Sequence, residues 1–398
     1  MKVLVWNIQK FTASKVPIND DHRKRTRVSE MPAIANYLEM VFSGNYRSNN
    51  RPDVIALLEV IDNRGTGLGK TPTDDSLATI GLITLQQFMT SLNIRDAVWL
   101  IAPPLKCNPP KPPLHPGRWP QEEVVGVLYD SNKVSFEGPN YWVNGASATQ
   151  LPAVPYDASY PAPWNNAAIT GPTARAGKVM FTDSTNNALN FPNQNNRRPF
   201  MVDFREKYGA RRLVRCAFLH TSPSTCKQAT VEIGKISAIS DATPDITIVA
   251  GDYNVNLRVE RDRAAYQELT TRNFNNQLTM LNTYSTHYKK LESATPVVLT
   301  RSDKYLVDKS SYQDKYFIDN FYVRVKGGVA TNVRVATAID MVMGVPDPYL
   351  RTMEDSLEDL KEISEEDITR GFLLFKDDDN FGHIRATSDH LPIFLNID

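Results

Sequence analysis

Short apolar runs rich in β-branched residues recur along the whole chain, from its first residues to its last. Each has the length and composition of a buried strand. They occupy residues 2–6, 53–58, 124–129, 213–219, 246–249, 317–325 and 391–397. Because a buried strand needs other layers to cover it, the chain must fold around sheets that draw strands from both ends of the sequence.

Helices are expected between these strands. Apolar side chains from Met31 to Phe42 recur at spacings of three and four after Ser29, a suitable N-cap, and predict an amphipathic helix that packs on a sheet. Two further helices are predicted over 76–92 and 229–240. This mixed pattern leaves two architectures open, a layered sandwich and a doubly wound parallel sheet.

The bulk composition limits how the chain can meet a polyanion. Lys plus Arg and Asp plus Glu both total 45, so no net positive charge attracts nucleic acid from a distance, and any such binding must use local patches. Cys107, Cys216 and Cys226 show neither a paired nor a zinc-type spacing. We expect all three to be reduced and structural.

The N-terminal residues and the hydropathy bear on location. The first strand begins directly after Met1, without the apolar region and cleavage site of a secretory leader. No apolar run reaches the roughly 20 residues that cross a bilayer. We therefore expect no membrane association, and a protein that is cytoplasmic or exported without a classical signal peptide.

Long polar stretches separate the predicted strands and helices. Loops of this length within a compact domain are commonly substrate-binding additions, or are disordered. We interpret them as insertions into a single domain spanning 1–398. They lie near 103–120, 141–196, 255–315 and 340–383.

Polar side chains stand where several predicted strands end. Asn7, Glu59, Asp252 and Asn254 each follow an apolar run. Taken singly, such residues are more often turn formers. Carboxylate and amide oxygens are, however, the ligands that Mg²⁺ prefers, and phosphodiester hydrolysis requires a metal and a base near the phosphate.

Four segments occur in an order that resembles the endonuclease/exonuclease/phosphatase superfamily, and pancreatic-type deoxyribonucleases in particular. They are residues 6–9, 52–59, 251–254 and 388–392, each preceded or followed by a predicted strand. The resemblance covers the core of the chain and leaves out the long insertions. It implies an α/β (α+β) fold, a four-layer α/β/β/α sandwich of two mainly antiparallel sheets flanked by helices.

The resemblance implies roles for two histidines. His390, in the Ser-Asp-His triplet, corresponds to the family's general base or water-positioning group, and Asp319 to the residue that orients it. A neutral histidine near pH 7 can accept a proton. His220, in a segment resembling the histidine segment of the deoxyribonucleases, would act as proton donor or oxyanion support, paired with Glu123.

The same resemblance implies a metal site and phosphate contacts. Glu59, with Asn7 and Asp389, would hold the cation, expected to be Mg²⁺, with Mn²⁺ or Ca²⁺ as alternatives. Asp252 and Asn254 would orient the nucleophile and the phosphate oxygens.

Substrate contacts outside this set are less specific. Arg197 resembles the arginine that contacts a phosphate beside the scissile one, a role that suits a guanidinium. The alternative interpretation is that Arg197 and Arg198 form a solvated basic pair. His383 and Arg385, just before the triplet, are candidates for contacting the substrate. The basic run 23–27 is either a solvated face or a grip on a backbone. We expect the remaining histidines to be surface residues, namely His22, His115 and His287.

Two positions depart from the family. Leu58 stands where the family commonly has Gln before the metal-binding glutamate, and it is expected to pack rather than ligate. Gln121 stands where the deoxyribonucleases carry an aromatic residue that enters the minor groove. The second departure weakens the expectation of duplex cutting.

Three functions are compatible with these residues. The favoured one is a metal-dependent endonuclease that cuts DNA through in-line attack by a histidine-activated water, with nucleic acid as partner. A phosphomonoesterase or a sphingomyelinase-type phospholipase of the same fold is the first alternative, although residues 317–320 lack the pattern of inositol polyphosphate phosphatases. A non-catalytic binding protein is the second. The oligomeric state stays open.

Overall fold

The computed structural model describes the strands and their connecting elements, which together form most of the predicted core. The described residues are 1–16, 38, 41–42, 51–62, 72–73, 75–91, 97–104, 106, 122–139, 142–143, 150–151, 181–191, 197–257, 259–277, 286–287, 289–290, 312–313, 317–326, 333–336, 388–390 and 392–397. Several predictions fall outside them: Arg385, His383, His22, His115, Gln121, Cys107, the basic run 23–27, most of 103–120 and 141–196, and all of 340–383.

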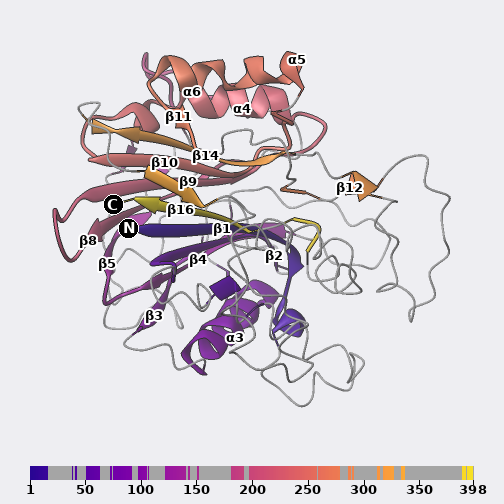
Figure 1. The fold of residues 1–398 in the computed structure, drawn as a ribbon, viewed down its shortest axis with the longest axis vertical. Helices are drawn as coiled ribbons and strands as arrows, with labels where there is room; N and C mark the ends of the chain where they lie inside the picture. Colours follow the sequence, from indigo (N-terminus) through magenta and orange to yellow (C-terminus); the bar gives the residue numbers. More distant parts are fainter. Residues whose placement is uncertain are drawn as a thin grey trace, which may run out of the picture.

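The first sheet joins the two ends of the chain. Its order is β15 (Val333–Ala336), β16 (Ile393–Ile397), β1 (Lys2–Phe11), β2 (Val54–Asp62), β4 (Glu122–Asp130) and β3 (Trp99–Ala102). Strand β1 pairs antiparallel with β16 and parallel with β2, and the other neighbours are antiparallel. The sequence-distant N- and C-terminal strands therefore lie side by side within this sheet (Figure 1).

The second sheet repeats this plan. Its order is β11 (Asn275–Asn276), β14 (Asp319–Val325), β10 (Ile246–Asp252), β9 (Leu213–His220), β8 (Phe200–Glu206) and β5 (Val134–Pro139). Only β9 and β10 pair in parallel. Two short ladders stand apart, β6 (Trp142–Val143) with β7 (Gln150–Leu151), and β12 (Lys289–Lys290) with β13 (Tyr312–Gln313).

Helices cover the outer face of each sheet (Figure 1). Helix α3 (Leu77–Ser91) packs Leu82 and Leu85 into the core of the first sheet. On the second sheet lie α4 (Cys226–Lys235), the 3₁₀ turns η2 (Ser237–Ser240) and η3 (Ala264–Tyr266), α5 (Glu260–Arg263) and α6 (Gln267–Thr271). A further 3₁₀ turn, η1 (Ala13–Lys15), follows β1. The result is the four-layer α/β/β/α sandwich expected from the sequence, with two mainly antiparallel sheets.

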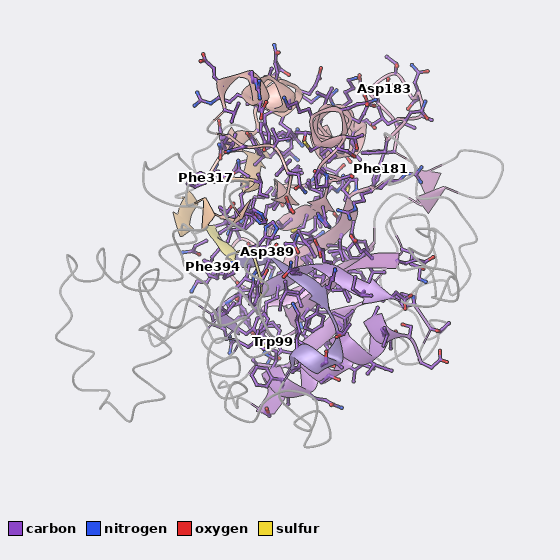
Figure 2. The ribbon with its side chains drawn as sticks, turned by 90° about the vertical axis from the view of Figure 1, so that its right-hand side faces the viewer. Trp99, Phe181, Asp183, Phe317, Asp389 and Phe394 are labelled. Carbon is purple, nitrogen blue, oxygen red and sulfur yellow. The ribbon has the colours of Figure 1, made fainter. Side chains whose placement is uncertain are left out.

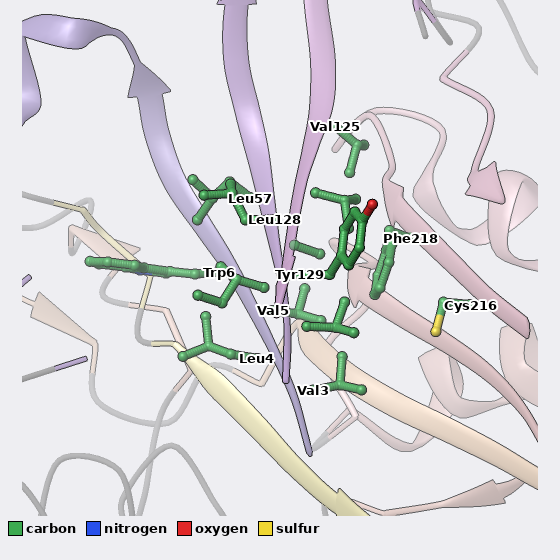
Figure 3. Packing of buried hydrophobic residues seen from close by; sticks show 14 of the residues in the cluster. Val3, Leu4, Val5, Trp6, Leu57, Val125, Leu128, Tyr129, Cys216 and Phe218 are labelled. Carbon is green, nitrogen blue, oxygen red and sulfur yellow. The ribbon is translucent and has the colours of Figure 1, made fainter. Parts of the chain in front are cut away.

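Strict alternation along β1 explains the layering. Val3 and Val5 point toward the second sheet, where Cys216 and Phe218 lie, whereas Leu4 and Trp6 point to the opposite face (Figure 3). Successive strand residues face opposite sides, so a run of apolar residues serves two layers at once. All of β1 from residue 3 to residue 8 is buried.

The predicted elements are present with shifted ends. All seven predicted strands occur, and the helix predicted over 76–92 is α3. The helix predicted over 229–240 begins earlier, at Cys226, and breaks at Ile236, because the Ser237 N–H leaves the helix to bond the Thr182 carbonyl, 2.8 Å away. Of the first predicted helix, Leu38, Val41 and Phe42 are described, and all three are buried.

The prediction that 255–315 is an insertion is wrong for its first part. Residues 259–277 form α5, η3, α6 and β11, which complete the second sheet and its helical layer. Tyr266, Leu269 and Phe274 are buried there against the second sheet. Among the described helices, none is long and apolar enough to span a membrane.

A glycine allows the two central strands of the second sheet to approach closely. Gly251 has φ +145°, and a Cβ built there would lie 2.0 Å from the Leu219 carbonyl oxygen. We expect Gly251→Ala to destabilise the protein by at least about 3 kcal/mol, since both the backbone conformation and the contact become unfavourable. Gly209→Ala is the matched control, because Gly209 also has positive φ but no atom lies within 4 Å of its added Cβ. Equal losses in chemical denaturation would contradict this explanation.

Candidate active site

Polar side chains from both sheets gather at the carboxyl ends of the central parallel strands. Asn7 and Glu59 lie where the regular parallel pairing of β1 and β2 breaks, and His220 and Asp252 are the last residues of β9 and β10. Each sheet contributes one parallel pair, and the Asn7 side-chain amide of the first pair donates to the Asp252 Oδ2 of the second at 3.0 Å. Asp389, just before β16, lies at mid-height between the half that carries Trp99 and the half that carries Phe181 (Figure 2).

The Ser-Asp-His triplet is bound to the first strand. The Ser388 hydroxyl donates to the Asn7 carbonyl at 2.5 Å and accepts the His390 N–H at 3.0 Å. The Trp6 indole N–H donates to the His390 carbonyl at 2.8 Å. The C-terminal histidine is therefore positioned directly by β1.

Asp319 orients His390. The His390 Nδ1 lies 2.8 Å from the Asp319 Oδ2, and both side chains are buried. Asp319 opens β14, where it pairs with Asp252 of β10. The hydroxyl of Thr286 accepts the backbone N–H groups of Ile318 and Asp319, each at 3.1 Å. This arrangement sets the imidazole orientation, with Nε2 turned toward the other polar groups.

His220 sits in a second, separate pair. Its Nδ1 lies 3.1 Å from the Glu123 Oε2, as the resemblance implied. The other Glu123 oxygen accepts from Arg197 at 2.9 Å, and the Arg197 Nη1 lies 2.7 Å from the His220 Nε2 and 3.1 Å from the Thr221 carbonyl. Arg197 thus lies against the histidine in this structure, whereas the sequence placed it on a neighbouring phosphate.

One carboxylate oxygen is shared by both histidines. The Asp252 Oδ2 lies 3.5 Å from the His220 Nε2, 3.6 Å from the His390 Nε2 and 3.0 Å from the Asn7 Nδ2. Its Oδ1 accepts the Asn254 N–H at 2.8 Å. Asp252 is only 1% exposed. The two imidazoles therefore approach one buried carboxylate oxygen.

Backbone strain is concentrated around these residues. Among the described part of the chain, four of the seven non-glycine residues with positive φ are here: Gln9 (46°), Lys10 (53°), Glu59 (58°) and Asn254 (51°). The pairing of β1 with β2 also shifts register at this point. The Asn254 amide donates to the Thr221 carbonyl at 2.9 Å, which helps hold its strained backbone. Strain and bulges of this kind are typical of functional sites.

The side chains expected to hold a cation are linked to one another by hydrogen bonds. The Asn7 amide is 3.2 Å from the Glu59 Oε1, and the Lys10 N–H donates to the other Glu59 oxygen at 3.1 Å. Gln9 links Asp389 to this group, because its backbone N–H reaches the Asn7 side-chain oxygen at 3.1 Å and its side-chain amide reaches the Asp389 Oδ2 at 3.0 Å. This set of carboxylate and amide oxygens fits a hard cation such as Mg²⁺.

A different grouping brings nitrogen ligands together. Among the described residues, two sets of three have ligand atoms that all lie within 4.8 Å of one another, and both contain His390. Glu59 belongs to neither. The sets are Asp252, Asp319 and His390, and His287, Asp389 and His390. The set of Asp252, Asp319 and His390 contains the Asp319–His390 hydrogen bond, so we interpret it as an acid–base network.

The charge state of His390 differs from expectation. Burial lowers its pKa, but the carboxylates of Asp319 and Asp252 more than compensate and raise it from 6.5 to about 10. Burial raises the pKa of Asp319 to about 6, although the His390 charge opposes this. With the protein side chains alone, His390 is therefore protonated near pH 7 and not neutral as expected. The cause is the carboxylates of Asp319, Asp252 and Asp389, which surround it in space.

This raised pKa predicts a measurable pH dependence. A histidine with a raised folded pKa contributes stability that is fully present below pH 6.5 and is lost as the pH rises toward about 10. We therefore expect thermal stability in EDTA to fall over this range, and to fall less in His390→Gln. NMR titration of ¹³C-labelled histidine would give the His390 pKa directly, and a value near 6.5 would contradict the assignment.

The sequence missed several residues that shape the site. His287, expected on the surface, is half-buried, and its ring lies 4.3 Å from that of His390. The sequence indicated no role for Gln9 or Thr286, because neither residue type is characteristic of a particular reaction. Leu58 is fully buried, as expected. Arg385 lies outside the described residues.

No protein-family model and no curated protein matches the chain. Several solved structures do. An endonuclease/exonuclease/phosphatase family protein from Leptotrichia buccalis shares 11% identity over 100% of this chain and 99% of its own, with a TM-score of 0.45. TDP2 of D. rerio, complexed with a single-strand DNA product, shares 10% over 100% and 98%, with a TM-score of 0.41. A mannosyl-6-phosphatase of Bacteroides thetaiotaomicron shares 12% over 100% and 99%, with a TM-score of 0.39. Likenesses this distant carry no argument about the chemistry of this chain, which rests on its own residues.

Proposed function

We propose that the chain is a divalent-metal-dependent phosphoester hydrolase, and that it is an endonuclease acting on DNA. One observation carries the proposal: two imidazoles, each held by its own carboxylate, approach a single buried oxygen of Asp252. Two proton-transfer groups that face one position can serve an in-line displacement at phosphorus, one at the attacking oxygen and one at the departing oxygen.

The protein groups then divide between the two sides of the phosphate. His390, with its charge stabilised by Asp319, would hold a phosphate oxygen and exchange a proton with the attacking water. His220, held by Glu123, would support the departing oxygen. Asp252 lies within 3.6 Å of both Nε2 atoms, so it would orient the water and balance the charge of both imidazoles.

Asn7, Glu59 and Asp389 would hold the cation. A bound Mg²⁺ would neutralise the phosphate and support the charge that develops during displacement. Positive charge beside Asp389 and Asp252 would also lower the pKa of His390, because the carboxylates that raise it would be partly neutralised. Metal binding and the readiness of His390 to accept a proton are therefore expected to be coupled.

A phosphomonoester is the second candidate substrate, and the position of Arg197 favours it. Arg197 bonds Glu123 and lies against His220, so it is engaged inside the site and does not extend along a nucleic-acid backbone. For the nuclease, Arg197 would have to exchange the Glu123 contact for a phosphate oxygen. The segment 219–224, with its deoxyribonuclease-like histidine, favours a phosphodiester as the substrate.

The substrate can be tested with a panel. We expect the purified protein to nick supercoiled plasmid with Mg²⁺ or Mn²⁺ and to stop with EDTA. RNA, single-stranded DNA, inositol phosphates and sphingomyelin complete the panel. Cleavage of a phosphomonoester with the plasmid left intact would overturn the choice of DNA. Absence of metal-dependent turnover on every substrate would overturn the enzyme itself and favour a binding protein.

A further inference from the structure

The backbone at His287 and at the preceding residue is bonded to the active site. It forms an antiparallel bridge with His390. The preceding residue, Thr286, is buried and accepts the N–H groups of Ile318 and Asp319. The imidazole of His287 is thereby held with its ring centre 4.3 Å from that of His390, the planes inclined at 55°.

Three ligand atoms converge at this contact. One atom each from His287, Asp389 and His390 all lie within 4.8 Å of one another, and the His390 Nε2 is 4.0 Å from the Asp389 Oδ1. A cation with bonds of about 2.1 Å bridges ligand atoms up to roughly 4 Å apart. Small side-chain rotations would therefore bring all three to one ion.

Two of the three ligands are already oriented by other side chains. Asp319 bonds the Nδ1 of His390 at 2.8 Å, which directs the Nε2 toward the site. Gln9 donates to the Asp389 Oδ2 at 3.0 Å, which directs the Oδ1. A carboxylate behind a ligating histidine is a recurrent feature of metal sites, where it sets the tautomer and strengthens the ligand.

We propose that His287, Asp389 and His390 form a second cation site, selective for a borderline transition-metal ion of the Zn²⁺ class. Two imidazoles and one carboxylate suit Zn²⁺ or Co²⁺ and discriminate against Mg²⁺, which requires oxygen ligands. The site shares Asp389 with the proposed oxygen site at Asn7 and Glu59, and differs from that site in its two imidazoles. Three protein ligands leave a coordination position open to water or substrate.

Occupation of this site has a consequence that rests on the proposed function. A cation bound to the His390 Nε2 removes the atom that would exchange a proton with water. Zn²⁺ is therefore expected to inhibit Mg²⁺-dependent hydrolysis, and His287→Gln to relieve the inhibition.

Metal binding can be measured without any activity. Co²⁺ would be titrated by visible absorption and Zn²⁺ by calorimetry, both in excess Mg²⁺, into the wild type, His287→Gln and Glu59→Gln. We expect His287→Gln to weaken Zn²⁺ and Co²⁺ binding by at least ~10-fold, since loss of a ligand costs no less than loss of an outer-shell partner. Glu59→Gln, the matched control in the oxygen group, should bind both ions at least as tightly as the wild type does, because Mg²⁺ then competes less for the shared Asp389.

The opposite pattern, with binding lost in Glu59→Gln and kept in His287→Gln, would overturn the proposal. So would Zn²⁺ binding no tighter than Mg²⁺ binding in the wild type. Imidazole ¹⁵N NMR of the wild type guards against a misfolded variant: Zn²⁺ should shift the resonances of both His287 and His390, and a shift of neither would contradict the site. Because these readouts need no substrate, they stand whether or not plasmid is cleaved.

Discussion

Replacing His390 with Gln is expected to lower kcat by about 10²–10⁴-fold, the usual contribution of a positioned acid or base. Gln keeps a hydrogen-bonding side chain beside Asp319 but cannot exchange a proton. His390 is buried and faces Asp319 and Asp252, whereas the imidazole of His287 lies with its ring centre 4.3 Å from that of His390. Initial rates on the preferred substrate at saturating Mg²⁺ would measure the loss.

Two comparisons separate chemistry from folding in this experiment. The variant should retain its circular dichroism spectrum and its Mg²⁺ affinity, because the proposed Mg²⁺ ligands are Asn7, Glu59 and Asp389. Asp319→Asn should lower kcat less and should also lower the pKa of His390, since Asp319 is the largest of the groups that raise it. A wild-type rate in His390→Gln would exclude the proposed mechanism.

Asp252→Asn is expected to reduce kcat by on the order of 10²–10³-fold, comparable with removal of one oriented electrostatic group from an active site. The change preserves shape but removes the negative charge that both imidazoles face, at 3.5 and 3.6 Å. It should also lower the pKa of His390, because Asp252 is one of the groups that raise it. Rates and an NMR titration of the same variant would measure both effects.

The matched control is Asp183→Asn, the same chemical change in a turn at the edge of the molecule (Figure 2). Asp183 bonds Thr185 and Asn187 within its own turn and contacts no active-site residue named above. Its rate should equal that of the wild type. If Asp252→Asn lowered the rate no more than Asp183→Asn, Asp252 would have no part in the reaction.

Much of the framework could be predicted because local patterns determine it. Apolar runs rich in β-branched residues located the strands, and the polar residues that follow these runs, such as Asn7 and Asp252, lie at one end of the sheets because parallel neighbours finish at the same edge. Further segments of the family resemblance implied the partners, and the structure places Asp319 beside His390 and Glu123 beside His220.

The remaining features depend on contacts between distant segments. His287 lies in a polar stretch with no periodicity, and only its backbone bridge to His390 brings it to the site. Arg197 bonds Glu123, and a phosphate would be an alternative partner for it. The sequence does not show which of the two partners the guanidinium prefers. The raised pKa of His390 depends on how many carboxylates surround it in space.

The most direct test of a shared phosphate is a double-mutant cycle in kcat between His220→Gln and His390→Gln. If both histidines serve one displacement, the double variant should lose little more than the more damaging single variant, because residues that act as a unit are strongly non-additive. Losses that multiply would show that the two histidines act independently, and would contradict a single reaction centre at Asp252.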